Sequence, residues 1–175
     1  MIFRATERAV ALDDSNQLAH AYLGLAALFL GDDVRGIGEM QRGVELNPNN
    51  PVVLTLVAWY LALQGELETA VPLATRAMEL IPHPPVWVDF PLFVDHYVQG
   101  RYEQALVLSR GGVVGPGQFP EPLVLAATLG QFGRVDEVTL ALEEFRTQWD
   151  QLCEQAGCEG LGALNGRLLL LTDNE

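Results

Sequence analysis

Residues 42–51 read RGVELNPNNP, and residues 76–85 read RAMELIPHPP. In each stretch a helical pattern of apolar residues gives way to Asn and Pro residues, which terminate helices. Pro48 and Pro82, which occupy the same place in the two copies, stand 34 residues apart. A third and weaker copy, RAVALDDSN, occupies residues 8–16. Self-similarity at a fixed period is typical of repeat architectures, so the chain is predicted to be an array of similar helical pairs.

Small residues recur at matching positions within this frame. Gly36 corresponds to Ala70, and Gly43 corresponds to Ala77. Such positions are expected where two helices approach so closely that only a small side chain fits. A glycine also recurs where the two helices of each pair should be joined, at Gly31, Gly65, Gly100 and Gly133. Each repeat is therefore predicted to be a helical hairpin with a tight glycine turn.

Residues 17–48 and 51–82 resemble tetratricopeptide repeats, with AHAYLGLAALFLGD and AVPLATRAMELIP as the clearest pieces. The resemblance covers roughly residues 3–149 and is looser in the last two repeats. The third repeat departs at Pro91, because proline inside a helix removes a hydrogen bond, so its first helix is expected to begin near Phe90. The fourth repeat has Val138 where a small residue is usual.

More narrowly, the amino-acid sequence of the third and fourth repeats resembles the C-terminal tetratricopeptide modules of two kinds of bacterial protein. These are the class III adenylate cyclases and the winged-helix transcriptional regulators. In both, the repeats are a sensory or scaffolding appendage, and the catalytic or DNA-binding domain lies elsewhere. The resemblance therefore implies a signalling or regulatory setting, although fold analogy does not by itself establish function.

The expected fold is all-α, a right-handed alpha-alpha superhelix of about four helical hairpins. The array is predicted to span residues 1–156, with an incomplete first repeat at 1–16 and repeats at about 17–50, 51–84, 86–116 and 119–152. Residues 157–175 are predicted to be a separate Gly/Leu-rich C-terminal tail. Helices are predicted near residues 3–12, 17–30, 34–46, 52–64, 67–80, 88–99, 102–110, 121–132 and 135–152.

Composition excludes several classes of function. The chain has 175 residues and a formal net charge of −13, which argues against a nucleic-acid surface and against anionic lipid. All ten basic residues are arginine, so a Schiff-base lysine and a phosphate-loop lysine are excluded. No apolar run approaches the roughly 20 residues that span a membrane, and the first residues do not read as a signal peptide. A cytoplasmic location is expected.

Groups that could carry chemistry are few. Cys153 and Cys158 could be free thiols, which we favour, or a disulfide, or part of a metal site. Asp89, Asp95 and His96 form the single carboxylate–imidazole group in the sequence, and a solvated Asp beside a packed His is the favoured interpretation. Neither Ser109 nor the glycines of residues 111–117 stand in a catalytic or phosphate-binding context. No catalytic residue, metal site or cofactor is predicted.

The resemblance implies where a partner would bind, because the first helix of each stacked hairpin lines the concave face. The residues implied for this wall are Leu18, Ala21, Leu25, Leu28 and Phe29, then Val52, Thr55, Trp59, Ala62 and Leu63, then Trp87, Phe90, Val94, Tyr97 and Val98. The candidate binding groove within this set is Leu25, Phe29, Trp59, Leu63, Trp87, Phe90, Val94 and Tyr97. Family members that bind a terminal carboxylate carry Lys, Arg and Asn there, so a carboxylate clamp is not expected.

A non-enzymatic module for protein–protein contact is the favoured function. An apolar groove could accept an amphipathic helix of a partner, the chain's own Leu-rich C-terminal residues, or a second copy in a homodimer. The helix near 3–12 lacks a covering first helix, so its apolar side (Phe3, Val10) must be covered or serve in association. The alternatives are the regulatory fragment of a nucleotide cyclase or transcriptional regulator, and a small-molecule sensor with Trp59, Trp87, Phe90 and Tyr97 as an aromatic pocket.

Overall fold

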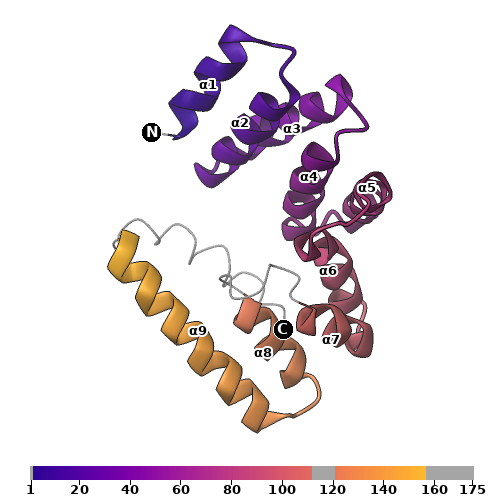
Figure 1. The fold of residues 1–175 in the computed structure, drawn as a ribbon, viewed down its shortest axis with the longest axis vertical. Helices are drawn as coiled ribbons and strands as arrows, with labels where there is room; N and C mark the ends of the chain where they lie inside the picture. The colour runs from indigo at the N-terminus through magenta and orange to yellow at the C-terminus, as the bar shows by residue number, and fades with distance from the viewer. Residues whose placement is uncertain (1, 112–120, 157–175) are drawn as a thin grey trace. The chain divides into compact units, whose positions relative to one another are not determined.

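A computed structural model describes residues 2–111 and 121–156 of the chain, and every regular element in these ranges is a helix (Figure 1). The chain divides into two compact units, a first unit of residues 1–115 and a second unit of residues 116–175. The division falls in the Gly- and Pro-rich stretch that the sequence marks as a break between helices. Each unit is described by itself.

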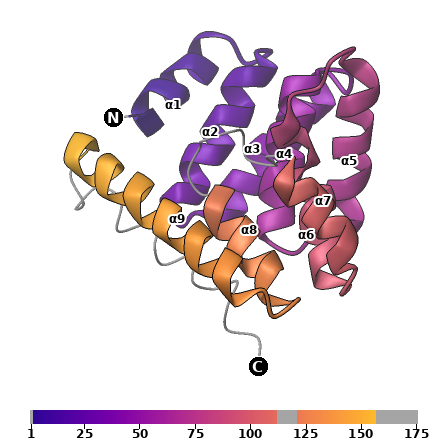
Figure 2. The ribbon, with the colours of Figure 1, turned by 60° about the horizontal axis from the view of Figure 1, so that its bottom comes forward.

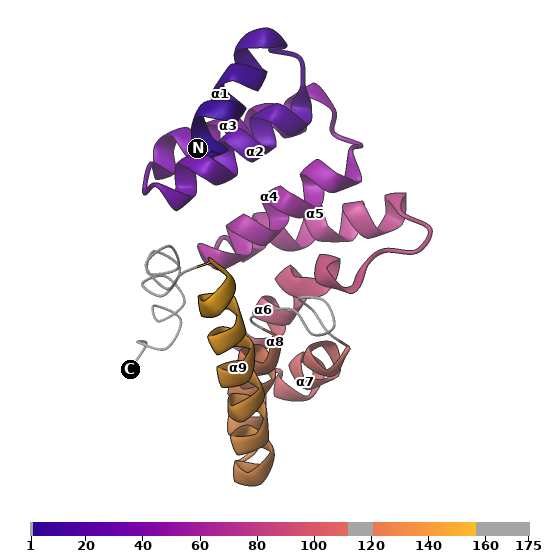
Figure 3. The same ribbon diagram turned by 60° about the vertical axis from the view of Figure 1, so that its left-hand side comes forward.

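The first unit is a succession of helical hairpins. Its elements are α1 (Ile2–Leu12), α2 (Gln17–Phe29), α3 (Asp33–Leu46), α4 (Pro51–Leu63), α5 (Leu67–Leu80), the 3₁₀ turn η1 (Val86–Asp89), α6 (Phe90–Val98) and α7 (Tyr102–Arg110). Helices α2 and α3 form one hairpin, α4 and α5 the next, and α6 and α7 a third, stacked in chain order (Figure 3). The first helices α2, α4 and α6 lie beside one another, and α1 packs on α2.

The second unit contains one further hairpin, made by α8 (Glu121–Gly130) and α9 (Val135–Ala156), which run side by side (Figure 2). The helices of both units therefore follow the predicted order, with ends that differ from the predicted ones by a few residues. The predicted all-α, helical-repeat fold is confirmed.

Local sequence signals set the beginning of the helices. The side chain of Asn16 accepts a hydrogen bond from the Ala19 N–H at the start of α2, and Asn50 accepts from the N–H groups of Val52 and Val53 at the start of α4. A cap of this kind satisfies backbone donors that have no partner inside the helix. The Asn/Pro-rich breaks of the sequence thus terminate one helix and start the next.

The recurring glycine makes the same turn in each hairpin. Its φ is +84° at Gly31, +81° at Gly65, +72° at Gly100 and +64° at Gly133. In the first turn the Gly31 N–H donates to the Leu28 carbonyl and the Asp32 N–H donates to the Ala27 carbonyl, both at 3.0 Å. This αL turn satisfies the last carbonyls of the helix, and it strongly favours glycine because a Cβ atom is strained at positive φ.

The third hairpin begins as the sequence predicts. Helix α6 starts at Phe90, and Pro91 lies in its first turn. Proline is tolerated there because its missing N–H would have no partner inside the helix. The preceding residues, 86–89, form the short 3₁₀ turn instead of helix.

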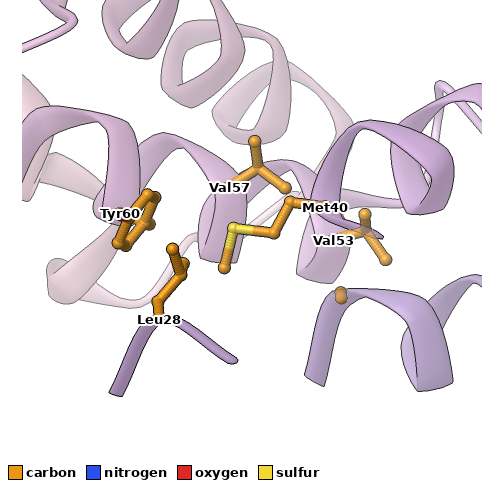
Figure 4. Packing of buried hydrophobic residues seen from close by; sticks show 6 residues of the cluster. Leu28, Met40, Val53, Val57 and Tyr60 are labelled. Carbon is orange, nitrogen blue, oxygen red and sulfur yellow. The ribbon is translucent and has the colours of Figure 1, made fainter. Parts of the chain in front are cut away.

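The core of the first unit lies between the first and second helices of the hairpins. Ala21 and Leu28 of α2, Met40 of α3, and Val53, Val57 and Tyr60 of α4 form one buried cluster, whose large side chains converge in Figure 4. Leu54, Ala77 and Val88 form a second cluster. The small residues identified in the sequence lie at the closest approaches: Ala70 and Ala77 are fully buried, and a Cβ on Gly43 would meet the Gln17 carbonyl oxygen at 2.9 Å.

Candidate protein-interaction surface

Helices α2 and α4 contain no Asp, Glu, Lys or Arg, and their one titratable group of the charged kind is His20. Helix α2 reads QLAHAYLGLAALF, and α4 reads PVVLTLVAWYLAL. His20 does not face solvent: its Nδ1 lies 2.6 Å from Glu39 Oε2, and its Nε2 lies 2.9 Å from the Asp14 carbonyl oxygen. Both helices are therefore apolar on the exposed side as well as on the buried one.

The exposed side of each of these two helices carries a row of apolar residues. We call the two neighbouring rows together the apolar stripe. On α2 the row consists of Leu18, Tyr22, Leu25 and Phe29, and on α4 it consists of Val52, Leu56, Trp59 and Leu63. Members on one helix are three or four residues apart, which places them on one face. Each member of α2 has its counterpart on α4 one repeat later, and the two helices are neighbours.

The stripe is open to solvent. Phe29 is 57% exposed and Tyr22 46% exposed, while Leu18, Val52 and Leu63 are each more than one third exposed. Leu25, Leu56 and Trp59 are half-buried between their neighbours. Large apolar side chains gathered in one exposed patch are typical of surfaces that bind another molecule.

In the first two of these helices, α2 and α4, four residues assigned to the wall lie in the core instead. Ala21, Leu28, Thr55 and Ala62 are buried. Each of them is adjacent in sequence to a stripe residue or one residue further, and a single residue rotates a helical side chain by about 100°. Tyr22 and Leu56 were missed, although their spacing of four residues from Leu18 and Val52 points to them.

The third hairpin continues the exposed row only in part. Phe90 and Val94 are buried, with 5% and 8% exposed, while Trp87 and Tyr97 are half-buried. The Phe90 ring stacks on Trp59 with 4.5 Å between ring centroids. The centroid of the Phe93 ring lies 6.2 Å from that of Phe90 and 5.9 Å from that of Tyr97. These rings pack on one another, so Phe90 and Val94 belong to the core rather than to an open groove.

Helix α1 is held against the first hairpin. The Arg35 guanidinium lies 4.9 Å from the centroid of the Phe3 ring, and its Nη2 donates to Glu7 Oε1 at 2.9 Å. Phe3 and Val10 are half-buried. The predicted exposed apolar side of this helix is thus partly covered, by Arg35 at Phe3.

The carboxylate–imidazole group has a structural explanation. Arg101 donates from Nε to His96 Nδ1 at 2.9 Å, and its guanidinium also bonds Asp95 and Gln99. These bonds tie the end of α6 to the start of α7 across Gly100. Asp89 lies apart from this network, and burial raises the pKa of its carboxyl group above the ordinary value of 3.8.

The remaining residues considered in the sequence analysis either have a structural role or lie outside the described residues. Ser109 is buried and donates to the Leu106 carbonyl oxygen at 3.1 Å. The side chains of Cys153 and Cys158 and the glycines of residues 112–117 lie outside what the structure describes. Within the described part of the chain, no three His, Cys, Asp or Glu residues come together as metal ligands would. None of the described helices is both long and apolar enough to cross a membrane.

Two solved structures share this arrangement of helices. A crystal structure of MamA is 15% identical in sequence and matches with a TM-score of 0.58 over 87% of this chain and 89% of that one. A structure of MamA AMB-1 is 24% identical, with a TM-score of 0.56 over 86% of this chain and 87% of that one. No protein-family model and no curated protein matches the sequence. The structural likeness supports a tetratricopeptide-type helical-repeat fold and, at these identities, the fold alone.

Proposed function

We propose that this chain is a non-enzymatic protein-interaction module and that the apolar stripe of α2 and α4 is its binding surface. The observation that carries the proposal is the stripe itself: two adjacent uncharged helices expose aromatic and aliphatic side chains in register. Burying a large apolar side chain contributes about 1.5–3 kcal/mol, so a few of these residues suffice for a specific contact.

The stripe favours a partner with an apolar helical face. Helices that bind in grooves use anchors at positions i, i+3 or i+4, and i+7, which is the spacing of the stripe residues themselves. Because no charged side chain on α2 or α4 faces solvent, the anchors of the partner should be uncharged. The partner is another protein or a second copy of this chain, as in a homodimer, and the chain's own residues 157–175 are a third candidate.

A peptide-binding experiment tests the stripe. An uncharged amphipathic helix of Leu, Ala and Gln, about four turns long, serves as the probe. The double substitution Tyr22→Asp and Phe29→Asp should raise its Kd by at least about tenfold, because it places two charges against apolar anchors. Fluorescence anisotropy of the labelled peptide measures the change.

The matched control removes apolar surface and adds the same charge outside the stripe. Val34 is 88% exposed on α3 and Val107 is 71% exposed on α7, so Val34→Asp with Val107→Asp should leave the Kd within about threefold. Equal weakening by the two double variants would show that the probe does not bind the stripe and would refute this assignment.

The wider setting rests on resemblance. A bacterial origin, a signalling or regulatory role, a cytoplasmic location, and a role as regulatory fragment of a nucleotide cyclase or transcriptional regulator all stay predictions. A catalytic or DNA-binding domain encoded in the same reading frame would support the regulatory interpretation. The alternative of a small-molecule sensor stays a prediction too, but Phe90 of its aromatic pocket is buried and stacked on Trp59.

A further inference from the structure

A concave surface lies on the first unit, on a different face from the stripe. It is a groove of about 690 Å³ between α3 and α5, with α4 as its floor. Its apolar lining is Ile37, Met40, Val44, Val57, Leu61 and Leu73, and its polar lining is Gln41, Glu45, Tyr60, Glu66 and Thr69. A volume of this size is within the range of sites that bind ligands or anchor side chains.

The groove and the stripe use different faces of the same helix. The stripe takes Val52, Leu56, Trp59 and Leu63 of α4, whereas the groove takes Val57, Tyr60 and Leu61. At about 100° per residue, these two sets point roughly 120° apart. An occupant of one surface therefore leaves the other free.

The floor of the groove is part of the buried core of the first unit. Met40, Val57 and Tyr60 belong to the buried cluster of the first unit, where their side chains converge (Figure 4). Leu61 and Leu73 pack against that cluster and are half-buried. A cavity whose floor is already fixed by the core needs little rearrangement to receive a side chain.

The length of the groove suits a helix. Its lining runs from Ile37 to Glu45 on α3 and from Glu66 to Leu73 on α5. At 1.5 Å per residue, the two walls are about 12 Å and about 10 Å long, or roughly two helical turns each. Two turns of a bound helix present anchors at positions i, i+4 and i+7.

The charged residues that line the groove are acidic. Its lining includes two carboxylates, Glu45 and Glu66, and no basic residue. Glu45 has one ion pair, with Arg42 at 3.4 Å, and both of these side chains are more than half exposed, so the pair neutralises the rim weakly. Among the described residues, Glu66 forms no salt bridge, and its side chain does not cap α5. The rim therefore complements positive charge.

We infer that this groove is a second docking site, which takes a basic amphipathic helix: its apolar side chains enter between α3 and α5, and its Lys or Arg residues pair with Glu45 and Glu66. The surface is separate from the stripe, so this inference does not depend on the proposed function. Electrostatic complementarity of this kind selects between partners of opposite charge.

The test uses a fluorescent amphipathic helix of Leu and Lys, about four turns long, with a Leu/Glu helix as its counterpart. The Leu/Lys peptide should bind and the Leu/Glu peptide should not. In the double variant Glu45→Lys with Glu66→Lys, the Kd of the Leu/Lys peptide should rise by at least about tenfold. Thr69→Trp, which places a large ring in the groove, should weaken binding without any change of charge.

Two matched controls separate the site from general attraction to an acidic protein. Glu68 and Glu79 are exposed on α5 and do not line the groove, so Glu68→Lys with Glu79→Lys changes the net charge equally. This control and the stripe variant Tyr22→Asp with Phe29→Asp should each leave the Kd within about threefold.

Three outcomes would overturn the inference. The two lysine double variants could weaken binding equally, which would indicate unspecific electrostatics. The stripe variant alone could abolish binding, which would place the peptide on α2 and α4. Thr69→Trp could bind the peptide as tightly as the wild type while its melting temperature is unchanged. Circular dichroism of each variant verifies that it is folded.

Discussion

At the scale of single residues, Gly24 decides how closely α2 and α3 can approach. A Cβ atom at this position would lie 2.6 Å from Met40 Cγ and 2.7 Å from the Gly36 carbonyl oxygen. The Met40 side chain could move, but the backbone oxygen of α3 could not without shifting the helix. Gly38, on the exposed side of α3, has no atom within 4 Å of its Cβ position.

This contrast predicts opposite effects for the same substitution. Gly24→Ala should destabilise the protein by roughly 1–3 kcal/mol through overpacking. Gly38→Ala should stabilise it by up to about 1 kcal/mol, because alanine loses less conformational entropy in a helix. Urea denaturation of both variants measures the two changes, and a wild-type-like midpoint for Gly24→Ala would mean that α2 and α3 pack differently.

The raised pKa of Asp89 predicts that the stability of the protein depends on pH. Burial raises its folded-state pKa above 3.8, so the charged carboxylate is disfavoured in the folded state. The stabilising effect of the protonated carboxyl group is fully present below its ordinary pKa. This effect is lost as the pH rises through the folded-state pKa. Asp89→Asn should therefore be more stable than the wild type at neutral pH, and the difference should shrink towards pH 4. Melting temperatures across this range test the expectation.

Asp13 is a control of opposite sign. Hydrogen bonds from the Ser15 hydroxyl and N–H lower the pKa of its carboxyl group below 3.8. Its stabilisation is present above its ordinary pKa and is lost as the pH falls through the folded-state pKa. Asp13→Asn should not stabilise the protein at neutral pH. An equal rise in melting temperature for the two variants would mean that reduced net charge, rather than burial of Asp89, is the cause.

At the scale of elements, α1 packs on α2 and is also held by one side chain of α3, Arg35. Arg35 joins Glu7 by an ion pair and lies over the Phe3 ring, and its side chain is 38% exposed. A partly exposed ion pair and a cation–π contact each contribute about 0.5–1 kcal/mol. The attachment of α1 should therefore be weak compared with that of helices inside the hairpins.

Arg35→Met should loosen α1 selectively. The substitution keeps the aliphatic stem and removes the charge, so about 1 kcal/mol of local stability should be lost. Hydrogen exchange should become faster at α1 amides and stay unchanged at α4 amides. Arg8→Met, on the exposed side of α1, is the control. Unchanged exchange at α1 in the Arg35 variant would show that packing on α2 alone holds the helix.

At the scale of the whole molecule, apolar attraction opposes electrostatic repulsion. The net charge of −13 keeps copies of the chain apart, while the stripe on α2 and α4 favours contact. Salt reduces the range of the repulsion from about 10 Å at 0.1 M to about 3 Å at 1 M and leaves apolar contact intact. The balance should therefore depend on ionic strength.

Self-association through the stripe should strengthen as salt rises. Sedimentation of the full chain at low and high salt measures the mass, with the Tyr22→Asp, Phe29→Asp variant as control. The variant should remain a monomer in both conditions. Removal of residues 157–175 tests the third occupant, since exposure of the stripe would then increase association. A wild type that stays monomeric throughout, with or without those residues, would leave the stripe for another protein.

Local sequence signals are sufficient to place the helices of this protein. The Asn/Pro breaks and the glycines at positive φ are local signals, because capping bonds and αL turns involve residues next to one another in the chain. The 34-residue period also showed which residues are equivalent between α2 and α4. The tetratricopeptide resemblance implied Leu25, Phe29, Trp59 and Leu63 as wall residues, and these side chains are half-buried or exposed.

Which face of each helix is buried depends on how the helices pack against one another. In helices that are apolar all round, such as α2 and α4, spacing groups residues into rows but does not say which row faces the core: Tyr22 is exposed and Leu28 is buried. The burial of Phe90 depends on Trp59 of another hairpin, and the groove at Met40 depends on three helices together. Both are contacts between distant parts of the chain, whose geometry is decided by packing rather than by local signals.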